Sequence, residues 1–197
     1  MRLHHDLRLP TSVKQMNADQ LRALQAPIKQ LYRDDPSTAR VVMHASGATH
    51  ASDPSDASDT AQASQLTCFV DTSIGQVVAG LHPAAGGSGE HACSGDMLLQ
   101  ALVACSGVTL SVVATAMGIE IRSANITAQA EMDFRGTLGI DKSVPVGITS
   151  LCLNFEFDSP AEDAQLKKLI ELTERYCVVL QTLAQPAKLS TSFKRVS

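Results

Sequence analysis

The chain has 197 residues, a formal net charge of −4 at pH 7, and 44% hydrophobic residues against only 4% aromatic ones. This length supplies one sizeable domain, and the apolar fraction is enough to fill its core. The negative net charge argues against non-specific nucleic-acid binding, which requires a basic surface. With two tyrosines and no tryptophan, the chain also has little aromatic surface on which bases or sugars could stack.

The cysteines and the N-terminal sequence indicate a cellular compartment. The first residues, MRLHHDLRLPTS, lack the apolar region of a signal peptide. The chain has five cysteines, an odd number without CxxC spacing, which favours free thiols in a reducing compartment over a disulfide framework. We therefore expect a cytoplasmic protein.

Residues 1–36 are expected to form an N-terminal helical arm. Asn17 is placed to cap a helix that begins at Ala18, after which apolar residues recur at helical spacing. Pro27 interrupts this pattern and should bend the helix or start a second one. The sequence DDP at 34–36 should end it. We expect the arm to lie on the main body or on a partner subunit.

Residues 37–197 are expected to form a single α+β domain. Its first strands are predicted at Ala39–His44, Gln65–Asp71 and Gly75–Leu81. Between them, the Ser/Asp/Ala-rich run at 45–64 cannot bury enough apolar surface to order itself, so we expect a flexible loop or a long hairpin loop there. This run lacks the DxDxDG pattern of a calcium-binding loop.

The longest apolar run is SGDMLLQALVACSGVTLSVVATAM, from Ser94 to Met117, with no charged residue between Asp96 and Glu120. Its length and composition fit either the central helix of a soluble core or a membrane span. Polar residues spread through the run, and the absence of close flanking Lys or Arg, favour the soluble core. Ser94 is the expected N-cap, with Asp96 in the first turn.

A 3.6-residue repeat divides the side chains of this helix between two faces. One face is expected to carry Leu98, Leu102, Cys105, Val108 or Thr109, and Val112. The other carries small or polar residues that would let a second backbone approach, namely Gln100, Ala104, Gly107, Ser111 and Thr115. Because the helix is apolar nearly all round, we expect it to be buried nearly all round.

The remaining elements complete the expected fold class. Glu120–Arg135 and Gly147–Asp158 alternate as two long strands with one buried face. The sequence SPAE at 159–162 places Ser at N-cap, Pro at N1 and Glu at N3 of a second long helix, which should end before Pro186. A short final strand is expected at Lys188–Val196. This order predicts an α+β fold with antiparallel sheet and not a doubly wound parallel one.

Two cysteines, Cys105 and Cys177, fall on the apolar stripes of the two main helices, so packing of these helices would bring their thiols together. In a reactive pair, one thiolate attacks a peroxide to form a sulfenic acid, and the second thiol resolves it as a disulfide. The alternative is that both are core residues, because free cysteine often packs as a small hydrophobe.

Cys93, just before the central helix, allows three further hypotheses. With His82 and His91 it would supply three metal ligands, without a fourth and without a recognisable spacing. These residues would otherwise be loop residues near the mouth of an active site. Cys93 would resolve Cys105 in place of Cys177 only if the helix unwound, because twelve helical residues separate them by about 18 Å. The two other cysteines are expected to pack within strands: Cys68 and Cys152.

Two segments resemble motifs of the OsmC/Ohr family. GDMLLQALVACSGVTL is similar to the family's first cysteine motif, and LTERYCVVLQTLA is similar to its second, with the resemblance extending over Gln65–Val196. The resemblance implies antiparallel sheets wrapped around two long central helices in an intertwined homodimer. It also implies a cofactor-free oxidative-stress enzyme that reduces organic hydroperoxides, with Cys105 as the peroxidatic cysteine, Cys177 as the resolving cysteine, and an unidentified dithiol as reductant.

The chain departs from the family pattern around the first cysteine. Where the family has a Glu that polarises this thiol, the chain has Gly95; the adjacent Asp96 is one bond shorter and lies about 100° further round the helix. Arg33 and Arg40 are the alternatives for the family's N-terminal Arg, and Val178 replaces its Pro. Without a nearby cation, burial is expected to raise the pKa of the first thiol. The alternative function is therefore a non-enzymatic OsmC-like protein that binds a small apolar ligand at the dimer interface.

Overall fold

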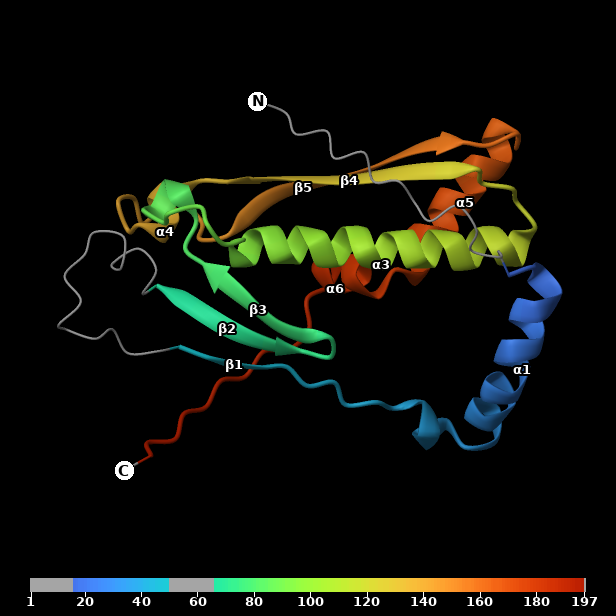
Figure 1. The fold of residues 1–197 in the computed structure, drawn as a ribbon, viewed down its shortest axis with the longest axis horizontal. Helices are drawn as coiled ribbons and strands as arrows, with labels where there is room; N and C mark the ends of the chain where they lie inside the picture. The colour runs from blue at the N-terminus through green and yellow to red at the C-terminus, as the bar shows by residue number, and fades with distance from the viewer. Residues whose placement is uncertain (1–15, 50–65, 197) are drawn as a thin grey trace.

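The computed structural model describes residues 16–49 and 66–196. Within these residues it forms a mixed α+β fold with one three-stranded and one two-stranded sheet, both antiparallel, as the sequence predicted (Figure 1). The helices are α1 (Ala18–Asp34), α3 (Ser94–Met117), α4 (Phe134–Thr137), α5 (Asp163–Tyr176) and α6 (Val178–Ala184), with 3₁₀ turns η1 (Pro36–Ala39) and η2 (Pro83–Ala85). The strands are β1 (Ser46–Ala48), β2 (Thr67–Thr72), β3 (Gly75–Gly80), β4 (Ser123–Met132) and β5 (Ile148–Asp158).

Helix α3 has the predicted bounds and forms the long axis of the fold. The β4–β5 sheet runs along it, α5 and α6 pack against it, and α1 meets its C-terminal end (Figure 1). Its N-cap is Cys93 and not Ser94: the Cys93 Sγ accepts from the Asp96 N–H, and the Asp96 carboxylate accepts from the Cys93 N–H at 3.1 Å. At the other end, Gly118 adopts φ 66°, the left-handed conformation that favours glycine at a helix end.

The core forms where the C-terminal half of α3 meets α5 and the β4–β5 sheet. Its buried residues are Leu110, Val113, Ala114, Ile119 and Leu169. Alternate residues of β4 and β5 pack against this cluster, among them Ile126, Phe155 and Phe157. The two long alternating strands are thus confirmed, in antiparallel register from Ser123 opposite Asp158 to Ala130 opposite Leu151.

The expectation that α3 is buried all round is wrong for the single chain. Only the stripe that faces α5 and α6 is buried, through Leu102, Ser106, Leu110 and Val113. By length and composition alone, the helix would suit a membrane span. Of its most apolar stretch of 18 residues, only 28% is buried within the single chain. The predicted face that carries Leu102 and Cys105 points partly outward. Three of its members are exposed: Leu98, Val108 and Val112.

The β2–β3 hairpin is confirmed, and β1 pairs with β2 on its far side, with Ser46 opposite Asp71. The strand predicted at Ala39–His44 is wrong. That segment is exposed and unpaired, and the first strand begins at Ser46, inside the run expected to be a loop. Residues 50–65 of that run lie outside the described part of the chain.

The final strand predicted at Lys188–Val196 is also wrong, because this segment pairs with no strand of the described chain. Leu189 and Phe193 are 93% and 97% exposed. An alternating pattern becomes a strand only where a sheet edge is available to it.

Helix α1 begins as predicted, with a reciprocal cap between Asn17 and Gln20. It continues through Pro27 to Asp34, so the proline does not start a second helix. Leu21 is the buried residue of this helix, and it lies at the end nearest α3.

The second long helix differs from the prediction in where it begins and in being interrupted. It begins at Asp163 with Glu162 as cap, while the Ser159 hydroxyl donates to the Glu120 carbonyl at 2.6 Å and accepts from the Ala161 N–H. It is also not continuous, because α5 ends at Tyr176 and α6 follows directly. This interruption builds the site described next.

Candidate functional site

The structure brings Cys105 and Cys177 together where α3 crosses the α5–α6 junction. Cys177 is fully buried, whereas Cys105 lies on α3 and is partly exposed. The Ser106 Oγ and the Cys177 Sγ share a hydrogen bond of 3.4 Å. Both cysteines are free thiols. A partly exposed thiol therefore lies beside a fully buried one.

The break between α5 and α6 supplies hydrogen-bond donors to this site. Cys177, with φ −72° and ψ 104°, is at once the C-cap of α5 and the N-cap of α6. The first N–H groups of a helix have no partner within it. Here the N–H groups of Val178 and Val179 are directed at the Cys105 sulfur.

These donors lower the pKa of the Cys105 thiol. Partial burial raises the pKa, but hydrogen bonds from the Val179 N–H, the Cys177 and Thr109 side chains and the Val178 N–H together outweigh it. The net pKa lies below the ordinary value of a cysteine. The expectation of a raised pKa was wrong because it considered only cations and overlooked neutral donors.

Replacing Thr109 by valine should raise the pKa of Cys105, because it removes one of the donors while keeping the shape of the side chain. Only the thiolate is alkylated at a useful rate, so a lowered pKa moves the rise of the rate to lower pH. We expect the pH profile of Cys105 alkylation by iodoacetamide to rise at higher pH in Thr109→Val than in the wild type. Thr115→Val, six residues further along α3, is the matched control and should leave the profile unchanged. Coincident profiles for all three proteins would contradict this account.

The charged residues considered as activators lie elsewhere. The Asp96 carboxylate caps α3, nine residues before Cys105, which is about 13 Å along the helix. Arg33 donates to Gln30 on α1 at 2.8 Å, and Arg40 follows η1 as an exposed residue. In the described part of the chain, no arginine contributes to the lowered pKa of Cys105.

The residues considered for a metal site do not converge, and within residues 16–49 and 66–196 no three His, Cys, Asp or Glu side chains gather as ligands. The His82 Nδ1 accepts from the Ala84 N–H, and its ring stacks on Phe134 at 4.7 Å between centroids. Cys93 is held as the cap of α3.

The two strand cysteines differ from each other. Cys68 is half-buried on β2, as expected of a packing residue. Cys152 is exposed on β5 with its sulfur 3.6 Å from the Asn154 Oδ1, so the expectation that it packs in the sheet was wrong.

Sequence reasoning missed the residues that surround the two thiols. Ser106 could have been found, because it lies at helical spacing between Leu102 and Leu110 on the buried stripe. The donors at Val178 and Val179 could not, because they depend on a helix break marked only by two consecutive β-branched residues.

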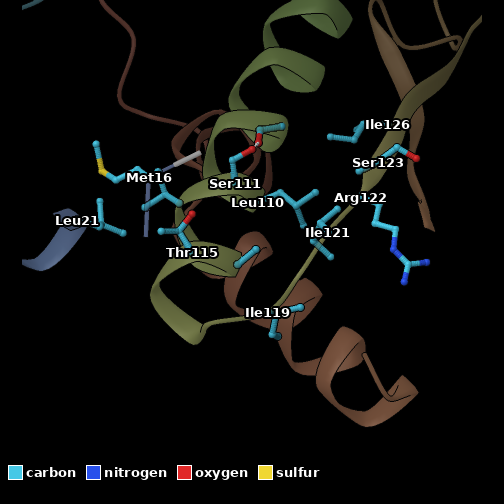
Figure 2. A pocket seen from close by; sticks show the side chains of 14 residues that line it. Met16, Leu21, Leu110, Ser111, Thr115, Ile119, Ile121, Arg122, Ser123 and Ile126 are labelled. Carbon is cyan, nitrogen blue, oxygen red and sulfur yellow. Dashed lines mark hydrogen bonds between the residues drawn. The ribbon is translucent and has the colours of Figure 1, made fainter. Parts of the chain in front are cut away.

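A second feature is a cavity of about 570 Å³ between α1, α3 and β4. Figure 2 shows Met16 and Leu21 on one side of it, and Ile121 and Ile126 on the other. Ser111 and Thr115 of α3 lie between these two sides. The walls are mostly apolar, and none of the five cysteines lines the cavity.

The comparisons with known proteins agree with this fold. The model of the family described as OsmC-like protein matches residues 87–192, just over half of the chain. A search of curated proteins gives no match. Similar solved structures include an OsmC-like protein from Mycoplasma pneumoniae, with 16% identity, a TM-score of 0.57 and coverage of 74% of this chain and 89% of that one.

Two further solved structures are named as organic hydroperoxide resistance proteins. The Legionella pneumophila protein has 12% identity and a TM-score of 0.54, with coverage of 74% of this chain and 93% of that one. The Elizabethkingia anophelis protein has 12% identity and a TM-score of 0.55, with coverage of 75% and 92%. At these identities the likeness shows the fold alone, and the family match is the finding that identifies the chain. The chain belongs to the OsmC-like protein family.

Proposed function

We propose that this protein is a cytoplasmic, thiol-dependent peroxidase that reduces organic hydroperoxides, with Cys105 as the attacking thiol and Cys177 as the resolving thiol. The observation that carries the proposal is the set of neutral donors around Cys105, which lowers its pKa while a buried second thiol lies beside it. A low-pKa, accessible thiol next to a resolving cysteine is the arrangement that peroxide reduction requires. The names of two similar structures point to the same substrate class.

The proposed reaction has three steps: attack on the peroxide, formation of the disulfide, and reduction of the disulfide. The Cys105 thiolate attacks the terminal peroxide oxygen, the O–O bond breaks, and the released alkoxide takes a proton to leave as an alcohol. Cys105 is then a sulfenic acid, and attack by the Cys177 sulfur forms the disulfide and releases water. An external dithiol reduces the disulfide by exchange and is itself oxidised. Consumption of cumene hydroperoxide with dithiothreitol as reductant tests the cycle.

We further propose that the protein acts as a homodimer that covers the exposed face of α3. Val108 and Val112 are 67% and 38% exposed, and they share helical spacing with Cys105. A helix this apolar is rarely left uncovered in water. Because Cys105 belongs to the same stripe, a second copy packed there would place the thiol at the subunit interface.

Replacing Val108 by lysine should dissociate this dimer. The residue is exposed in the single chain, so a lysine there leaves the fold intact, but in a dimer its charge would be buried without a partner. We expect a dimer for the wild type and a monomer for Val108→Lys by light scattering after size-exclusion chromatography. Ile140→Lys, at a position 71% exposed and outside α3, is the control and should stay dimeric. A monomeric wild type would contradict the proposal.

A second candidate function is the binding of a small apolar ligand, which the apolar walls of the cavity in Figure 2 favour. The two candidates differ in what the cysteines do. Ligand binding without catalysis predicts that a hydrophobic fluorescent probe binds equally to the wild type and to Cys105→Ser, and that neither consumes hydroperoxide.

A further inference from the structure

Ser106 is a buried polar residue for which the proposed reaction has no role so far. It is fully buried on the stripe of α3 that faces the α5–α6 junction. Within the described residues, every buried side-chain nitrogen or oxygen has a hydrogen-bond partner. For the Ser106 hydroxyl, that partner is the Cys177 sulfur at 3.4 Å.

Other hydroxyls on these helices bond differently. Ser111, Thr173 and Thr182 each donate to the carbonyl four residues earlier, the usual local partner of a helical hydroxyl. Ser106 instead bonds across the helix interface to a residue 71 positions away. Its hydroxyl therefore joins α3 to the junction that carries the buried thiol.

We propose that Ser106 is a positioning residue for the disulfide-forming step, holding the Cys177 sulfur in the direction of Cys105. This inference rests on the proposed peroxidase function. A cysteine side chain rotates among three staggered positions, and a hydrogen bond at the sulfur favours one of them. Fixing the attacking atom near its target is a large part of the rate of such a step.

Disulfide formation requires no reactant besides the Cys105 sulfenic acid and the Cys177 thiol. The Cys177 sulfur attacks the sulfur of the Cys105 sulfenic acid, the S–S bond forms and the S–O bond breaks. The proton of the Cys177 thiol leaves with the departing hydroxide as water. As that proton leaves, the Ser106 hydroxyl donates a hydrogen bond to the Cys177 sulfur and stabilises the negative charge that the sulfur carries until the S–S bond forms.

The test compares the reduced full-length wild type, Ser106→Ala and Ser106→Thr after one equivalent of cumene hydroperoxide. Samples are quenched over time with dimedone, which traps the sulfenic acid, and mass spectrometry measures the trapped Cys105 and the Cys105–Cys177 disulfide. In Ser106→Ala, we expect Cys105 to be oxidised at the wild-type rate and disulfide formation to slow by about tenfold. Ser106→Thr, which keeps the hydroxyl, should restore most of the rate.

Thr173→Val is the matched control for packing. It removes another buried hydroxyl of the same interface, one whose hydrogen bond goes to the Leu169 carbonyl and not to a thiol. Equal slowing in Thr173→Val and Ser106→Ala would overturn the inference, because the effect would then come from loosened packing. Equal disulfide formation in Ser106→Ala and the wild type would also overturn it. If Cys105 of the wild type is not oxidised, the proposed function itself fails.

Under excess hydroperoxide and without dimedone, the sulfenic acid has a second fate that gives an independent measurement. When disulfide formation is slow, the sulfenic acid reacts with a second hydroperoxide molecule. The sulfenic acid is oxidised to sulfinic acid, and the hydroperoxide is reduced to an alcohol. We expect Ser106→Ala to accumulate Cys105 sulfinic acid over repeated turnovers faster than the wild type and Thr173→Val. Equal accumulation in the three proteins would contradict the proposed role.

Discussion

Cys105→Ser is expected to lower the rate of cumene hydroperoxide consumption by about three orders of magnitude or more, because serine at neutral pH supplies no comparable nucleophile. Cys177→Ser should behave differently. It keeps the attacking thiol, so without added reductant it should consume one equivalent of hydroperoxide rapidly. It should then consume a second equivalent more slowly, as the unresolved sulfenic acid is oxidised to sulfinic acid, and stop there. Peroxide consumption measured at both short and long times separates the two variants.

Cys152→Ser is the matched control for this pair, since it removes an exposed thiol that lies on β5 and not at the α5–α6 junction. It should consume hydroperoxide at the wild-type rate. If Cys105→Ser stays active while Cys152→Ser loses activity, the assignment of the attacking thiol is wrong. If all three variants match the wild type, no thiol assigned here takes part.

Leu169→Ala is expected to lower the free energy of unfolding by about 2–5 kcal/mol, the range for removing a fully buried leucine from a core. Leu169 has no exposed surface and lies in the cluster that joins α5 to α3. Urea unfolding followed by circular dichroism measures the change, at one protein concentration throughout because dimerisation would contribute to stability.

Leu183→Ala on α6 serves as the comparison, because Leu183 is 38% exposed and its truncation opens little cavity. We expect it to cost less than half as much as Leu169→Ala. Similar costs for the two variants would contradict the assignment of Leu169 to the core between α3 and α5.

The sequence predicted those elements whose signals are local. The bounds of α3 follow from a long apolar run without charge, and the β4–β5 pair follows from strict alternation over about ten residues each. The cap of α1 at Asn17 follows from its side-chain chemistry. Each of these features is decided by a few neighbouring residues.

The errors arose where a partner decides the structure. Lys188–Val196 has a strand pattern, but a strand needs an edge, and in the described chain none pairs with it. The SPAE sequence satisfies the rules for a helix start, yet the Ser159 hydroxyl bonds to the Glu120 carbonyl and the helix starts later. The exposure of Val108 likewise depends on what covers α3.

The candidate site was half predictable. The apolar periodicity of two helices placed Cys105 and Cys177 on faces that could meet, and the fold brings them together. What lowers the pKa of Cys105 was not predictable, because the donors of Val178 and Val179 exist only where α5 stops and α6 begins. Asp96, the charged residue nearest to Cys105 in the sequence, instead caps a helix.

The central claim is tested most directly by counting the free thiols of the reduced protein before and after one equivalent of organic hydroperoxide, with the new disulfide mapped by mass spectrometry. We predict the rapid loss of two thiols per chain as a single Cys105–Cys177 bridge. Folded protein that loses no thiol, or that forms a bridge without Cys105, would contradict the account.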